Sequence, residues 1–328
     1  MNMPKLLLLI LLFCFAHIAD AQDASYSQFY NVGHWFNPAR VGAMRENIKA
    51  GIHYRRQWTN DLNGFRTNGV NGEMRVGRSP FSVGVVVVDD KAGQAQLKTF
   101  QAIASGAYHQ VVDRDRFFSA GFQLGIVQRS INMDGLAWDA QYNGFQYDPS
   151  LDNMERQFSN QSGTKLDLGL GLFFRSDREW KWGAGYAFHH LGQEQTFLQN
   201  GEDKLGIRHT AQGFIETDIS RFSVRMDGLI QRQRGVMEAI VFARSEYRFG
   251  DDSRYTRVNN SSAVKAGCGY RHSGAIIPMI GFEWERKVEL AISYDIMIAG
   301  ASAVVGFTGG PEFALIYRYN TDKRMRIN

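Results

Sequence analysis

The sequence predicts an all-β protein, a transmembrane antiparallel β-barrel of about fourteen strands that follows a cleaved signal peptide. Three observations support this fold class. Large apolar residues alternate with polar residues or glycine in repeated blocks, short and long connections follow one another, and the N-terminus carries an export signal. Only helices and closed barrels satisfy their backbone hydrogen bonds in lipid, and an alternation with a period of two fits the barrel.

Residues 1–21 are predicted to be a secretory signal peptide. The apolar run Leu6–Phe15 follows a basic residue and precedes Ala19-Asp20-Ala21, which has the small residues of a cleavage site. The run is too short to span a bilayer as a helix. A lipoprotein signal with Cys14 as the lipidated residue is the weaker alternative, because a bulky residue precedes that cysteine. Cleavage leaves Cys268 as the single cysteine, so no internal disulfide is expected.

Residues 22–46 precede the first strand and are predicted to form a periplasmic or lumen-filling segment. Asn37-Pro38 imposes a turn there, because proline restricts both its own backbone and that of the residue before it. The segment is expected to start on the periplasmic side. Asn37 and Pro38 are therefore candidates for contact with a partner or for plugging the barrel.

Residues 47–328 are predicted to form the barrel, and their alternation assigns one face of each strand to lipid. The block Leu166–Phe174 has a large apolar residue at every even position. In another block Phe122, Leu124 and Ile126 are assigned to lipid, whereas Gln123 is assigned to a polar lumen. The lumen faces of several blocks carry charges that a bilayer would reject.

The connections alternate in length, as expected for periplasmic turns and extracellular loops. Tight turns at 77–80, 113–115 and 176–179 alternate with longer stretches at 89–96, 130–163 and 191–204. The alternation weakens later, because 232–235 is short and 250–261 is long. A soluble barrel or sandwich also alternates, but the few prolines, the aromatic residues near segment ends and the export signal favour a membrane barrel.

The long loop 131–163 is the richest candidate for a functional site in the barrel region. It holds aromatic side chains among polar residues, and such long loops are usually functional. Three interpretations stay open: a plug or lid in the barrel mouth, a surface that grips a partner, and a loop packed on its own rim. The candidate contact residues are Trp138, Asp139, Tyr142, Phe145 and Tyr147.

The sequence contains no recognisable catalytic constellation, so no catalytic, cofactor-binding or metal-binding residues are assigned and the protein is predicted not to be an enzyme. His189-His190 is the most tempting pair, but neighbours on a strand point to opposite faces and cannot share a metal ion. A girdle or turn pair is expected instead. The formal net charge of +4 has both signs spread along the chain, which gives no nucleic-acid footprint.

Several short motifs occur in order along the whole mature chain. They are Ser27–Tyr30, Asn37–Gly42, Tyr54–Trp58, Asp134–Asp139, Gly269–Arg271, Ile277–Glu283, Ser293–Ile296 and Gly310–Tyr319. These stretches resemble the PorP/SprF family of Bacteroidetes, whose usual opening is close to "SQY…NPAYAG…YRNQW" and whose final strand is close to "HEISLxYRF". Two departures are Arg40, where tyrosine is usual, and Pro311, where histidine is common.

The resemblance implies a non-enzymatic outer-membrane barrel of the type IX secretion and gliding machinery. Such a subunit would support secretion or surface attachment of a partner adhesin and would anchor periplasmic components. The implied partners are outer-membrane lipid, periplasmic secretion-ring or peptidoglycan-binding components and a secreted surface adhesin, with no cofactor. The alternative function is a transport barrel, either porin-like or a channel for hydrophobic solutes.

Overall fold

The computed structural model describes residues 23–44, 46–57, 64–93, 97–130, 139–142, 145–148, 150–151, 162–192, 205–250, 261–298 and 309–320. The predicted signal peptide, residues 1–21, lies outside the described residues. No helix in the described ranges is both long enough and apolar enough to cross a bilayer.

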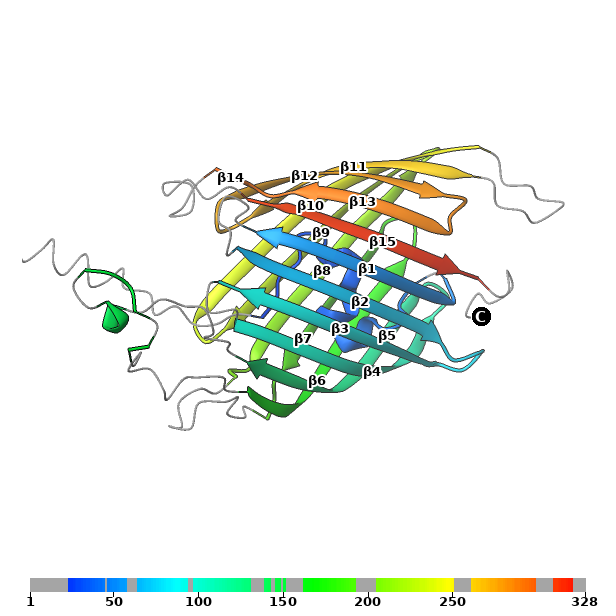
Figure 1. Ribbon diagram of the computed structural model, residues 1–328. Helices are drawn as coiled ribbons and strands as arrows, with labels where there is room; N and C mark the ends of the chain where they lie inside the picture. The colour runs from blue at the N-terminus through cyan, green and yellow to red at the C-terminus, as the bar shows by residue number, and fades with distance from the viewer. Residues whose placement is uncertain are drawn as a thin grey trace, which may run out of the picture.

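Fourteen antiparallel strands of the described chain form one closed barrel (Figure 1). They are β1 (Ile48–Gln57), β2 (Phe65–Arg75), β3 (Phe81–Ala92), β4 (Leu97–Asp113), β5 (Arg116–Ser130), β6 (Ser162–Asp177), β7 (Lys181–His189), β8 (Arg208–Ile219), β9 (Phe222–Gln233), β10 (Val236–Phe249), β11 (Ser262–Arg271), β12 (Ala275–Trp284), β13 (Val288–Tyr294) and β15 (Pro311–Tyr319). Pairing of β1 with β15, from Ile48 opposite Tyr319 to Arg55 opposite Glu312, closes the ring. The short β14 (Ile296–Met297) continues the pairing with β12 beyond β13. The predicted fold is confirmed.

The two faces of the wall follow the predicted alternation. On β5, Phe122 and Leu124 are 59% and 48% exposed on the outside, whereas Gln123 between them is 2% exposed. On β11, Val264 and Cys268 face outward and Lys265 is buried in the lumen. An apolar exterior with charges confined to the interior is what a bilayer requires of a barrel.

The barrel has two different ends, which we call the turn end and the loop end. At the turn end, short connections join β2 to β3, β4 to β5, β6 to β7, β8 to β9 and β12 to β13. The loop end carries the connection that contains residues 139–151. Tight turns also lie at the loop end: between β9 and β10, where Arg234 and Gly235 have φ angles of 47° and 91°, and between β11 and β12, where Gly274 has a φ angle of 93°. Short turns face the periplasm in outer-membrane barrels, which orients the molecule.

Residues 23–44, which we call the plug, lie inside the barrel (Figure 1). The plug contains three short helical turns, η1 (Phe29–Val32), α2 (Gly33–Phe36) and η2 (Pro38–Arg40). Asp23 contacts the loop end of the wall, and Ala43 contacts Arg175 near the turn end. The described chain therefore starts at the loop end, opposite to the periplasmic start expected from its position before β1.

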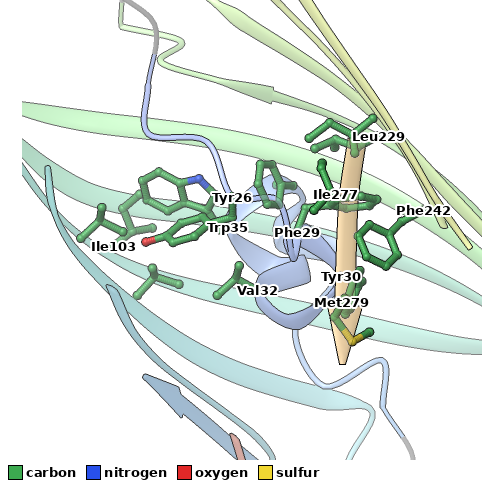
Figure 2. Packing of buried hydrophobic residues seen from close by; sticks show 14 residues of the cluster. Tyr26, Phe29, Tyr30, Val32, Trp35, Ile103, Leu229, Phe242, Ile277 and Met279 are labelled. Carbon is green, nitrogen blue, oxygen red and sulfur yellow. The ribbon is translucent and has the colours of Figure 1, made fainter. Parts of the chain in front are cut away.

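The apolar core of the protein lies in the lumen, where the plug packs on the wall. Figure 2 shows plug residues such as Phe29 and Trp35 surrounded by inward-facing residues of several strands. These wall residues are Val86, Val88, Ile103, Leu229, Ile240, Phe242, Ile277 and Met279. The alternation alone predicted a uniformly polar lumen. The observed lumen is partly apolar, because part of it serves as a core for the plug.

Candidate functional site

The middle of the plug is fixed by a turn at Asn37 and Pro38, both of which are buried in the lumen. The Asn37 Oδ1 accepts a hydrogen bond from the Ala39 N–H at 2.9 Å, and its Nδ2 donates to the Leu172 carbonyl of β6 at 2.9 Å. A Cβ placed on Gly171 would lie 2.1 Å from the Asn37 Oδ1. Glycine on the lumen face of β6 therefore allows the plug to approach the wall backbone.

Near the loop end, a buried group of polar and charged side chains joins the plug to strands β1, β11 and β15. We call this group the motif cluster, and its residues are Ser27, Gln28, Arg55, Arg271, Asp295 and Glu312. The backbone N–H groups of Ser27 and Gln28 donate to the two Glu312 carboxylate oxygens at 2.7 and 2.9 Å. A carboxylate that accepts backbone N–H groups forms strong charge-assisted hydrogen bonds. The Glu312 side chain thereby joins the plug to β15.

The two arginines of the motif cluster complete its charge balance. Arg55 of β1 donates to the Asp295 carboxylate at 2.7 Å and lies 3.4 Å from the Glu312 carboxylate. Arg271 of β11 donates to the Ser27 hydroxyl at 2.7 Å, and that hydroxyl donates to Asp295 at 2.6 Å. Two guanidinium groups therefore face two carboxylates around the plug backbone, which is the arrangement that buried charges require.

Asp23 forms a second ionic contact at the loop end. Its carboxylate lies 2.5 Å from the His190 Nε2 and 2.8 Å from an Arg208 nitrogen, and the His190 Nδ1 lies 2.9 Å from Asp167. Because carboxylates only accept hydrogen bonds, both ring nitrogens of His190 donate and the ring is a cation. Burial alone would lower the pKa of His190, but Asp23 and Asp167 raise it to about 9.

The expectation that His189 and His190 form a girdle or turn pair is wrong, because both rings are buried in the lumen. His190 follows the last residue of β7 and has a φ angle of 59°. This left-handed conformation breaks the strand geometry and turns the second ring to the same side as the first. The His189 Nε2 donates to the Phe36 carbonyl of the plug at 2.9 Å. No group of side chains suited to bind a metal ion occurs in the described ranges.

At the turn end the lumen holds a cavity of about 560 Å³, which we call the vestibule. The plug residues Tyr30 and Arg40 line it from above, and turn residues such as Arg221 and Arg286 line its rim. Charged side chains of β8 to β12 form much of its wall. The vestibule is therefore a polar chamber that faces the periplasmic side.

The structure places the predicted contact residues in two separate regions. Asn37 and Pro38 are buried in the lumen, whereas Tyr142, Phe145 and Tyr147 are exposed. The green segment with the described residues 139–142 and 145–148 lies beyond the loop end (Figure 1). The rings of Tyr142 and Tyr147 lie 5.7 Å apart, and Phe145 between them is 99% exposed. Asp139 lies in the short helix η3 (Asp139–Gln141), and Trp138 lies outside the described residues.

All six residues of the motif cluster lie in stretches that resemble the family, but the sequence assigns no role to them. Five of its six residues fall in four of the matching stretches, and Arg271 falls in a fifth. The alternation in the sequence places charges on the inward face of the strands, but it does not predict that these charges line one chamber. The available signal in the sequence was the set of inward-facing charged residues near strand ends that have no oppositely charged neighbour along the same strand.

Comparison with known proteins identifies the chain. Residues 18–319 match the family model described as "Type IX secretion system membrane protein PorP/SprF". The chain belongs to the PorP/SprF family. The expectation from the sequence motifs is confirmed, and the barrel is an outer-membrane β-barrel of the type IX secretion system. No functionally curated protein matches this chain.

Solved structures are similar to this PorP/SprF barrel in fold. A Pseudomonas aeruginosa FadL homologue has a TM-score of 0.50 at 11% identity, covering 87% of this chain and 93% of the other. BamA from Haemophilus ducreyi has a TM-score of 0.42 at 10% identity, covering 84% and 71%. Salmonella typhi OmpF has a TM-score of 0.34 at 9% identity, covering 83% and 97%.

The PorP/SprF family is a structural component of the secretion system, and no catalytic role is indicated.

Proposed function

We propose that this PorP/SprF barrel supports secretion or surface attachment of a partner adhesin and anchors periplasmic components. The observation that carries the proposal is the plug, which the motif cluster and the apolar core bind to the wall across the lumen. A lumen that is occupied in this way favours binding of partners at the two ends of the barrel over passage of solutes through it. The loop end faces the adhesin, and the turn end faces the periplasmic machinery.

The exposed aromatic residues beyond the loop end support a contact with the adhesin. Tyr142, Phe145 and Tyr147 are all exposed, and aromatic side chains of this kind are enriched among the residues that dominate binding interfaces. Tyr142 and Tyr147 pair through an isolated antiparallel bridge. A partner that covers Phe145 would bury a large apolar area at little cost in conformational entropy.

The test is a triple substitution, Tyr142→Ser, Phe145→Ser and Tyr147→Ser, in the chromosomal copy of the gene. Because these side chains are exposed, the barrel should still be heat-modifiable, while surface display of the adhesin should fall strongly. The matched control is Gln146→Ser with Ser150→Ala in the same segment, which should leave display unchanged. Normal display in the triple variant would refute the adhesin contact.

The alternative function, a transport barrel, makes a different prediction for the same purified protein. Wild-type barrels in planar bilayers should show little conductance if the plug stays bound to the wall. Steady, large conductance of the wild type, unchanged when the plug contacts are removed, would favour transport and contradict our proposal.

A further inference from the structure

The vestibule at the turn end has more cationic than anionic side chains. Its wall and rim carry six carboxylate residues, Glu46, Asp177, Glu216, Asp218, Glu246 and Glu283. They carry eleven basic residues, Arg40, Lys49, Arg175, Lys181, Arg221, Arg225, Arg244, Arg248, Lys265, Arg286 and Arg318. A recess lined mainly by one sign of charge focuses its field and attracts ligands of the opposite sign.

The carboxylates of the vestibule are already bound to basic neighbours. Glu216 accepts from Lys181 at 3.1 Å and from Arg225 at 2.9 Å. Glu283 lies 2.9 Å from the Lys265 ammonium and 3.0 Å from an Arg248 nitrogen. Three further carboxylates just behind the lining, Glu73, Asp227 and Glu289, pair with Lys49, Arg225 and Lys265, so the surplus of positive charge is smaller than the lining alone gives but keeps its sign.

Arg40 is a vestibule cation without a direct carboxylate partner among the described residues. It lies on the plug at the top of the chamber, donates to the Gln212 Oε1 at 2.7 Å, and lies over the Phe173 ring at 5.5 Å. Among the described residues its guanidinium forms no ion pair. Burial and the nearby Arg225 lower the pKa of Arg40 to about 10, which leaves it charged at neutral pH.

The nearest source of compensation is itself shared. Asp227 accepts from Arg225 at 3.0 Å and from Arg244 at 3.2 Å, so it is saturated by two other arginines. Arg244 also lies over the Tyr30 ring at 4.0 Å. Arg225 and Arg244 thus share one carboxylate at the top of the vestibule, whereas Arg40 interacts with it only at longer range, which leaves the Arg40 guanidinium able to bind a further carboxylate.

We infer that the vestibule binds an acidic peptide segment of a periplasmic protein, with one carboxylate of that segment against Arg40. A chamber of about 560 Å³ has the size of a ligand pocket, and a small inorganic anion would leave most of it unfilled. The partly exposed ring of Phe214 in the wall gives an apolar contact to a peptide. The plug closes the loop end, so the segment enters from the periplasm. The inference rests on the proposed anchoring of periplasmic components and specifies how one of them is recognised.

The test uses the full purified chain in detergent and a fluorescein-labelled hexaglutamate probe, with binding followed by fluorescence anisotropy. Hexaglutamate should bind, whereas hexaglutamine and hexalysine should not. Arg40→Gln should weaken binding by about tenfold or more, the factor expected when one charge-assisted hydrogen bond is lost. Arg78→Gln, at an exposed turn of the same end, is the matched control and should have no effect.

Two further variants keep the test decisive if Arg40→Gln fails to assemble. Arg40→Lys keeps the charge and should retain most of the affinity. Glu246→Gln removes an anion from the rim, so it should strengthen binding by about twofold to fivefold at low salt. Absence of hexaglutamate binding, or equal binding by Arg40→Gln and wild type in heat-modifiable barrels, would overturn the inference.

Competition separates the possible sources of the anion. Unlabelled acidic peptide should displace the probe, whereas inorganic phosphate and a synthetic peptidoglycan stem tetrapeptide should do so only weakly. Stronger displacement by either of the last two would overturn the assignment to a protein segment. Loss of adhesin display in the loop variant together with no peptide binding would refute this inference alone. Peptide binding together with normal display would instead refute the adhesin contact alone.

Discussion

The two ends of the lumen are built from the same strands, yet they treat their inward charges differently. At the loop end, Arg55 and Arg271 are almost completely buried and face Asp295 and Glu312 across the plug backbone. At the turn end, Arg244 and Arg248 are 18% and 25% exposed and line an open vestibule. The difference is made by the plug, which brings its own backbone donors to the first end and a further cation, Arg40, to the second.

This contrast teaches that the plug completes the inward charges of the wall at the loop end and leaves a cationic surplus at the turn end. Where the plug supplies hydrogen-bond partners, the charges are buried and contribute to holding it. Where the plug leaves a surplus of cationic side chains, the wall can bind an anionic ligand. Four predictions test this contrast, in order of decreasing expected effect.

Glu312→Gln should have the largest effect, because it leaves the buried Arg55 with one carboxylate fewer and weakens two hydrogen bonds to the plug. Removal of one member of a buried ion pair typically costs on the order of 3–5 kcal/mol of the free energy of unfolding. Urea unfolding in detergent, with limited proteolysis of the plug, measures it. An effect no larger than that of a turn-end carboxylate would break the contrast between the two ends.

Gly121→Ala should come next, since its Cβ would lie 2.3 Å from the Ala39 nitrogen and 2.4 Å from the Pro38 carbonyl carbon. Overpacking against backbone costs about 1–3 kcal/mol, so the plug should become more accessible to protease. The control is Gly228→Ala on β9, where a Cβ meets no atom within 4 Å. Equal protease sensitivity of the two variants would argue against a closely packed plug.

Raising the pH should weaken the loop end by up to about 3 kcal/mol through His190, because each unit of pKa shift corresponds to about 1.4 kcal/mol. The pKa of His190 is raised from 6.5 to about 9 in the folded protein, so its stabilisation is complete below 6.5 and is lost as pH rises through 9. Unfolding free energies of the wild type and His190→Gln should therefore differ at about pH 6 and converge at about pH 10. A constant difference over that range would show that the charge of His190 does not hold Asp23.

Glu246→Gln at the turn end should have the smallest effect on stability. Its carboxylate is 24% exposed and shares Arg248 and Lys265 with Glu283, so its loss should cost less than about 1 kcal/mol. The same urea titration measures it beside Glu312→Gln. A loss as large as that of Glu312→Gln would mean that the vestibule wall is as tightly coupled as the motif cluster.

The sequence by itself determined which residues meet lipid and where the strands run. Alternation is a local property, because successive side chains of a strand point to opposite faces and a bilayer accepts apolar ones only. Phe122, Leu124 and Gln123 could therefore be assigned from their neighbours alone, and the family could be inferred from short motifs in order.

Only the tertiary structure decided what those motifs do. Ser27 and Glu312 are 285 residues apart in the chain and meet because β1 pairs with β15 and because the plug returns through the lumen. His190 faces inward because of a single left-handed backbone angle, which periodicity cannot reveal. Closure of a barrel and the path of a plug depend on contacts between residues that are distant in the sequence. The sequence therefore could not show that the plug binds tightly at the loop end and leaves the vestibule at the turn end.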